Sequence, residues 1–306
     1  MKFSKYLQIK RYYGGLLAIE YDGSRYNGWQ RQSAAGSKGN TSVVTVQQEV
    51  EKALSTVAAH DVSVTCAGRT DAGVHATSQV VHFECAQDRG EKAWTRGVNS
   101  LLPRSIRVLW AREVDNGFNA RFSAEARRYH YVIYTRKQAS AILEGRVTHI
   151  PFKLDVEAMD SAAQALLGEQ DFTSFRAAGC QSSTPNRNVH KVTVSSHNDF
   201  VLIDIEANAF LQHMVRNIAG SLLVIGRGQK PVTWIAELLA LRNRCEAAMT
   251  AAPHGLYLVQ VKYPPSSGLP VGVLAPPFVD IDALSTLART THKELKWKRC
   301  NNVSSR

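Results

Sequence analysis

An acidic side chain lies two residues after an arginine, in a short loop bracketed by two glycines. The loop reads Gly68-Arg69-Thr70-Asp71-Ala72-Gly73-Val74-His75-Ala76, and residues on both sides of it alternate between apolar and polar, as strands do. A carboxylate presented between two strands can attack or shield an electron-poor sugar centre and then leave again. The same residues also fit an Asx turn, in which Asp71 accepts from the backbone near Gly73 and Arg69 is a solvated side chain.

The charge balance of the chain points to a polyanion as its partner. Lys and Arg number 37 against 26 Asp and Glu, a formal net charge of +11. No run of about 18 apolar residues is present to span a bilayer. Lysines interrupt the apolar residues of Met1–Lys10, unlike the apolar core of a signal peptide. We therefore expect a cytoplasmic protein without a membrane partner.

Cysteine and histidine spacing gives no sign of a metal centre. The five cysteines never occur as C-x-x-C, and the histidines form no H-E-x-x-H or H-x-H cluster; the residues are Cys66, Cys85, Cys180, Cys245, Cys300, His75, His82, His130, His149 and His213. We expect reduced thiols and no metal site.

Several separated motifs resemble the tRNA pseudouridine synthase A family, in the family's order. Besides the Asp71 loop, the similar segments are Tyr21–Ser24, Gly28–Gln32, Phe118–Ala124, Arg127–Tyr129, Phe210–Asn217 and Gly255–Leu258. The resemblance covers roughly residues 14 to 279. It implies a homodimeric isomerase that converts uridine to pseudouridine at positions 38, 39 and 40 in the anticodon stem-loop of tRNA, without cofactor or metal.

The resemblance also assigns roles to individual residues. Asp71 matches the nucleophilic aspartate, and Arg216 matches the basic residue that pairs with it. Arg69 matches the arginine that helps displace the target base from its stack. Tyr129 matches a tyrosine that stacks on the uracil and handles a proton, and Leu256 matches an apolar pocket residue.

Four of these residues also have an interpretation that involves no catalysis. Arg216 fits an exposed helix charge, Arg69 a phosphate contact, Tyr129 a packing residue and Leu256 a core strand residue. A carboxylate beside RNA phosphates is repelled by them, however, so a cation close to Asp71 is expected on physical grounds as well. Three further arginines in or beside the motifs are expected to contact the substrate, namely Arg31, Arg121 and Arg128.

The apolar patterns predict an α+β fold of two ferredoxin-like βαββαβ halves, whose antiparallel sheets abut around a central RNA-binding cleft. Strands are expected near residues 16–21, 62–66, 79–85, 106–110, 129–134, 192–195, 201–205 and 256–261. Helices are expected near 45–57, 94–102, 159–167, 214–225 and 234–241, the first beginning with a Thr45–Gln48 capping box.

Three segments follow from this order. Residues 14–115 form the half that carries the catalytic loop, residues 116–264 form the second half, and residues 265–306 form a Pro-rich and basic tail. The tail cannot enter a sheet interior, and we expect it to be loosely attached or partly disordered.

Other functions remain open at this point. A non-catalytic RNA-binding protein could have the same sheets, but the aromatic signature of such modules is missing. A synthase acting on another RNA would keep the same catalytic residues. A carboxylate-dependent hydrolase needs a second acid near Asp71, and the next one along the chain is Glu84, on the following strand.

Overall fold

A single sheet of ten strands organises the chain. The computed structural model describes residues 13–32, 43–115, 117–270 and 272–279. Its strands are β1 (Tyr13–Tyr21), β2 (Val64–Cys66), β3 (His75–Cys85), β4 (Ile106–Glu113), β5 (Ala126–Tyr134), β6 (Thr148–His149), β7 (Gly168–Asp171), β8 (Asn186–His197), β9 (Phe200–Ala207) and β10 (Leu256–Lys262). They pair in the order β4-β1-β3-β10-β5-β9-β8-β7, with β2 on β3 and β6 on β5.

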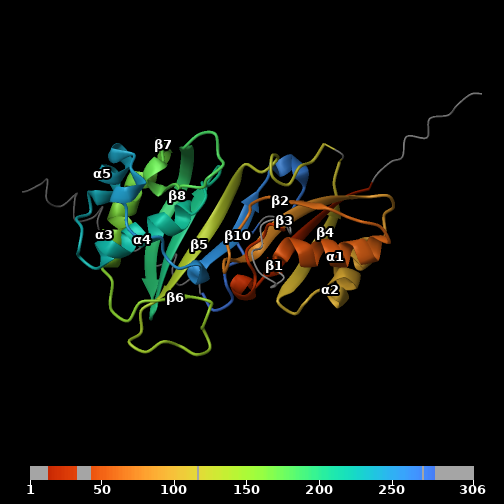
Figure 1. The fold of residues 1–306 in the computed structure, drawn as a ribbon, viewed down its shortest axis with the longest axis horizontal. Coiled ribbons are helices and arrows are strands. Elements are labelled where there is room, and N and C mark those ends of the chain that lie inside the picture. Colours follow the sequence, from red (N-terminus) through yellow and green to blue (C-terminus); the bar gives the residue numbers. More distant parts are fainter. Residues whose placement is uncertain (1–12, 33–42, 116, 271, 280–306) are drawn as a thin grey trace, which may run out of the picture.

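The helices of the described chain cover one face of this sheet (Figure 1). They are α1 (Val46–Ala58), α2 (Val98–Leu101), α3 (Val156–Ala163), α4 (Met214–Gly226) and α5 (Trp234–Leu241). One continuous core joins their buried side chains to every second residue of the strands, such as Leu17, Tyr129 and Ile203. This face therefore runs without interruption from one end of the sheet to the other.

Two sets of four strands repeat the same pairing order. The first is β4-β1-β3-β2 and the second is β10-β5-β9-β8, and within each set all neighbours are antiparallel. Between the sets, β3 and β10 pair in parallel at His75–Tyr257 and Ala76–Leu258. The predicted α+β class is confirmed, and the structure adds that the two sheets join edge to edge into one.

Loops pack against the opposite face of the sheet. Phe118, Tyr263 and Leu269 pack on Leu16 and Val80 in the first half. Val273, Phe278 and Val279 pack on the second half, around Tyr257 and Phe200. Part of the predicted tail is thus folded onto the sheet. Residues 280–306 lie outside the described residues, and the three segment boundaries stay a prediction.

The start of α1 differs from its predicted form. Thr45 does precede the helix, but its side chain makes no capping hydrogen bond, so the predicted capping box is wrong. Two first-turn amides instead bind backbone oxygens of the preceding motif: Val46 N donates to Gly28 O and Gln47 N donates to Trp29 O. The Gly28–Gln32 motif is thereby attached to α1.

A membrane-crossing helix is not among the elements that the structure describes, since none of its helices has both the length and the apolar character required.

Candidate active site

The carboxylate of Asp71 lies against the beginning of α4. Arg216 donates from Nη1 to Oδ2 of Asp71 at 3.1 Å, and His213 Nε2 lies 3.4 Å from the same oxygen. The Asp71 side chain is 29% exposed and that of Arg216 is 14% exposed. Arg216 is therefore not a free surface charge, and the pair that the resemblance implies is present in the structure.

The backbone, rather than the Asp71 side chain, makes the turn of this loop. Val74 N donates to the main-chain oxygen of Asp71 at 3.1 Å, and Gly73 N donates to Tyr26 O at 3.3 Å. In the described chain, the Asp71 carboxylate accepts no hydrogen bond from the backbone. The Asx-turn interpretation is therefore wrong, and the carboxylate stays available for chemistry.

Residues of the Tyr21–Ser24 and Gly28–Gln32 motifs contact the Asp71 loop directly. The Tyr21 hydroxyl and Thr70 Oγ1 are 2.7 Å apart and buried, and Trp29 N donates to Thr70 O at 3.0 Å. Gly28 has φ +86°, and a Cβ there would lie 2.8 Å from Thr70 O. Only glycine allows this conformation and this approach together. The Gly28–Gln32 motif therefore fixes the position of the loop that carries Asp71.

The second half fixes Arg216 by a similar close approach. Arg216 Nε donates to Ala251 O at 2.9 Å, and Ala251 N donates back to Arg216 O at 3.1 Å. A Cβ at Gly220 would lie only 2.1 Å from Met249 O, so glycine lets this segment lie directly on α4. One guanidinium nitrogen is thereby used for support, and Nη1 is aimed at Asp71.

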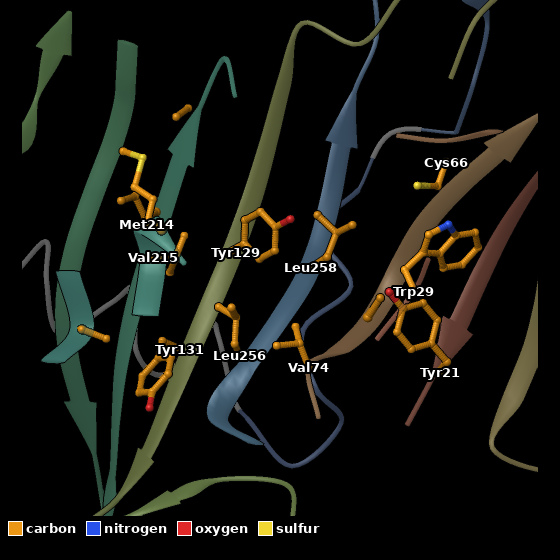
Figure 2. Packing of buried hydrophobic residues seen from close by; sticks show 14 of the residues in the cluster. Tyr21, Trp29, Cys66, Val74, Tyr129, Tyr131, Met214, Val215, Leu256 and Leu258 are labelled. Carbon is orange, nitrogen blue, oxygen red and sulfur yellow. The ribbon is translucent and has the colours of Figure 1, made fainter. Parts of the chain in front are cut away.

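Tyr129 lies on β5 beside Leu258 of β10, and Leu256 follows on the same helix-covered face (Figure 2). The Tyr129 ring packs edge to face on the ring of Phe210, with centroids 5.1 Å apart. Burial raises the pKa of Tyr129 well above its ordinary value, so the hydroxyl is protonated at neutral pH. A Cβ at Gly68 would lie 3.4 Å from that hydroxyl, which places Tyr129 beside the start of the Asp71 loop.

Sequence comparisons bear directly on this arrangement. A model of the tRNA pseudouridine synthase family matches residues 17–123 and 162–264, more than half of the chain and including Asp71 and Arg216. The chain belongs to the tRNA pseudouridine synthase family. It is therefore an isomerase by family, and the resemblance found in its motifs is confirmed.

The relatives of this chain are close to it in length and sequence. Two proteins described as tRNA pseudouridine synthase A, from Shewanella amazonensis and Shewanella sp. strain MR-4, are each 58% identical over 263 residues, covering 86% of this chain and 98% of theirs. A third from Shewanella baltica strain OS155 is 57% identical with the same coverage. A crystal structure of a Cbf5-Nop10-Gar1 complex aligns at 10% identity and a TM-score of 0.31, covering 80% of this chain and 48% of that one, too low a score to carry an argument.

Three of the predicted substrate-binding arginines are exposed. Arg69 is in the Asp71 loop itself. The carbonyl of Arg121 accepts from Arg127, which also donates to Ala67 O at 3.0 Å, so Arg121 borders the start of that loop. Arg31 lies beside α1 rather than in the loop. Its Nη1 is 3.3 Å from Glu51 of α1, and its side chain is 63% exposed.

The structure does not bring Arg128 to Asp71. Successive residues of a strand point to opposite faces, so Arg128 lies on the other side of the sheet from its neighbour Tyr129. There its Nε donates to Asp204 Oδ1 at 2.6 Å, and Lys191 Nζ lies 2.9 Å from Asp204 Oδ2. Burial raises the pKa of Asp204, but hydrogen bonds from Arg128 and His130 outweigh it and hold that pKa below its ordinary value.

Sequence reasoning missed His213 as a site residue. The search for metal-ligand spacing set it aside, and no group of three or more candidate ligands is found among the described residues. The signal that could have identified it is its place in the Phe210–Asn217 motif, three positions before Arg216.

Proposed function

We propose that this chain isomerises uridine to pseudouridine at positions 38, 39 and 40 of tRNA, with Asp71 as the nucleophile. The observation that supports this most is the position of Asp71: a partly exposed carboxylate on the loop between β2 and β3, bound through one oxygen by an arginine that is only 14% exposed. The Arg216 cation offsets the repulsion that RNA phosphates exert on Asp71.

The reaction needs an anionic oxygen on either of two routes. If Asp71 attacks C1′ of the ribose, a C–O bond forms as the C1′–N1 bond breaks and the uracil leaves with the electron pair. If it attacks the base ring, the carboxylate adds to the uracil before the glycosidic bond is broken. On both routes the uracil turns, C5 bonds to C1′ and loses its proton, N1 gains a proton and the carboxylate is released. No external oxidant or cofactor is required.

The residues around Asp71 suit a base that has left its stack. Arg69 is exposed and only two positions before Asp71, where a cation can take the place of the displaced base. Tyr129 and Leu256 lie on one face and offer an aromatic and an apolar surface for the uracil. Their contact with uracil is part of the proposal.

The anticodon stem-loop as the target, a homodimeric assembly and a cytoplasmic location belong to the same proposal. The net charge of +11 favours a polyanionic substrate such as RNA. The assembly rests on the resemblance to the family, and the location rests on the charged residues that interrupt the apolar ones in Met1–Lys10. Sedimentation of the purified protein measures the assembly directly.

The test uses undermodified tRNA with and without the protein. Pseudouridine is mapped by position, in wild-type transcripts and in transcripts with cytidine at 38, 39 and 40. We expect product at those positions only, and none in the substituted transcripts. Tight binding without product would support a non-catalytic RNA-binding protein, and product only in other RNAs would support a synthase with a different substrate.

A further inference from the structure

Two side chains at the beginning of α4 hold a single oxygen of Asp71. Arg216 Nη1 lies 3.1 Å and His213 Nε2 lies 3.4 Å from Oδ2. His213 directly precedes α4 and Arg216 lies in its first turn, so both reach Asp71 from the beginning of this helix. Within the described part of the chain, no hydrogen bond to Oδ1 is present, whereas Oδ2 accepts from Arg216. The carboxylate thus has one oxygen that is held and one that is available to a substrate.

The backbone of His213 is unusual for its place in the fold. It has the left-handed conformation, with φ 62° and ψ 2°, which is unfavourable for residues with a Cβ. The other described non-glycine residues with positive φ are Ala59, Asn198 and Arg242. Ala59 and Arg242 end helices and Asn198 lies in the β8–β9 turn, where this conformation is common. His213 instead lies just before a helix, as the third residue of a turn that Met214 N closes on Leu211 O, a position at which positive φ usually goes with glycine or asparagine.

Neighbouring contacts keep His213 in this conformation. Met214 N donates to Leu211 O at 3.0 Å, and Asn217 N donates to His213 O at 2.9 Å. Asn217 is itself buried and donates from Nδ2 to Phe175 O at 2.8 Å. The direction in which the imidazole leaves the backbone is therefore set by the fold. Strained backbone of this kind occurs where a side chain must be placed for function.

We propose that His213 is a positioning residue for Asp71, which fixes Oδ2 together with Arg216 so that Oδ1 stays free towards the substrate. The inference rests on the proposed function, because it matters only if the Asp71 carboxylate reacts. At 3.4 Å, the contact between His213 Nε2 and Asp71 Oδ2 is longer than the usual length of about 2.7–3.2 Å of an N–H···O hydrogen bond. Catalytic contacts of this kind shorten when substrate binds.

The first test compares His213→Ala with His213→Gln, using single-turnover isomerisation of tRNA and tRNA affinity. Alanine removes the imidazole, and we expect the rate to fall about 10- to 100-fold, the usual effect of losing one hydrogen bond to a charged group. The affinity should change by less than about twofold, since His213 contacts the carboxylate rather than phosphate. Glutamine can place an amide nitrogen near the position of Nε2, and we expect it to recover most of the rate.

The second test separates the side chain from the backbone strain. His213→Gly removes the imidazole and relieves the left-handed conformation, so the protein should melt at the same or a higher temperature while the rate still falls. Ala59→Gly is the matched control, since it relieves the same conformation at the end of α1 and should leave the rate unchanged.

The outcomes distinguish this inference from the proposed function. If His213→Ala and His213→Gly both isomerise tRNA within twofold of the wild-type rate, His213 does not position Asp71, whatever Asp71 does. A rate that falls equally in the alanine, glycine and glutamine variants would also overturn the inference, because the polar contact would then not matter. If Asp71→Asn retains the wild-type rate, Asp71 is not the nucleophile, and the inference fails with that assignment although the isomerase activity stands.

Discussion

Arg216 and Asp71 are 145 positions apart, yet their side chains meet at 3.1 Å and connect the two halves of the sheet. Asp71 comes from the loop between β2 and β3, and Arg216 comes from α4. Neither half contains both members of the pair. The site therefore requires the edge-to-edge pairing of β3 and β10, which brings the two halves together.

Replacing Arg216 with lysine should reduce the isomerisation rate by about 100-fold, although the positive charge is kept. A guanidinium binds Asp71 and Ala251 O with different nitrogens, whereas one ammonium group is a point charge and cannot reproduce that geometry. The measurement is the single-turnover rate at saturating enzyme. Arg227→Lys, just after the same helix, is the control and should be unaffected; a wild-type rate for Arg216→Lys would show that charge alone is enough.

Gly28→Ala should lower both stability and activity. Its φ of +86° costs an alanine about 1–2 kcal/mol, and the new Cβ would lie 2.8 Å from Thr70 O, which displaces the Asp71 loop. Gly228→Ala is the matched control, because Gly228 has φ +71° with no atom near its Cβ position. Thermal melting and rate are measured for both. We expect both variants to have a lower melting temperature than the wild type and only Gly28→Ala to lose activity. Equal isomerisation rates in the two variants would show that the Asp71 loop tolerates the added Cβ.

Replacing Tyr129 separates stacking from proton transfer. Phenylalanine keeps the ring and its edge-to-face contact with Phe210, so tRNA binding should be nearly normal. Alanine removes the ring and should cost about 1–3 kcal/mol of binding free energy. Equal binding defects in the two variants would argue against stacking on the uracil. The rate of the phenylalanine variant then reports on the hydroxyl, since a retained rate would exclude a role in proton transfer.

Arg128→Gln should reduce stability rather than RNA binding. The change removes the main partner of a buried carboxylate and should cost about 3 kcal/mol, with Lys191 and His130 still facing Asp204. The folded-state pKa of Asp204 lies below its unfolded value of about 4. Its contribution to stability is therefore complete above that pH and is lost as the pH falls. Without Arg128 the folded-state pKa rises, so acid unfolding should begin at a higher pH.

The salt dependence of tRNA binding tests whether Arg128 contacts the RNA. Arg121→Gln removes an exposed cation beside the catalytic loop and should reduce the slope of log K against log salt by about 0.7–0.9. Arg128→Gln should leave the slope unchanged. A reduced slope for Arg128→Gln would place that residue at the RNA.

The sequence predicted the elements better than it predicted the contacts between them. The strands and helices follow from two- and 3.6-residue apolar repeats, which are local. The parallel pairing of His75 with Tyr257 joins residues far apart, and no local pattern indicates it. The attachment of α1 to Gly28 and Trp29 was missed for the same reason, and a side-chain cap at Thr45 was predicted instead.

Arg128 shows a different cause of error. The motif grouped it with Tyr129, although the alternation that places Tyr129 and Tyr131 on one face already places Arg128 on the other. Its partner Asp204 is 76 positions away and could not be identified from spacing. Proximity in a motif therefore did not mean proximity in the site for Arg128, whereas His213 and Arg216 share both a motif and the contact with Asp71.

The most direct test of the account is single-turnover isomerisation by Asp71→Asn, with enzyme in excess over tRNA. The amide keeps the size of the side chain but cannot supply the anionic oxygen, so no pseudouridine should form. The variant should fold and bind tRNA as well as the wild type or more tightly, because one negative charge near the phosphates has been removed. Pseudouridine formation at a near wild-type rate by the folded variant would contradict the assignment of Asp71 as the nucleophile.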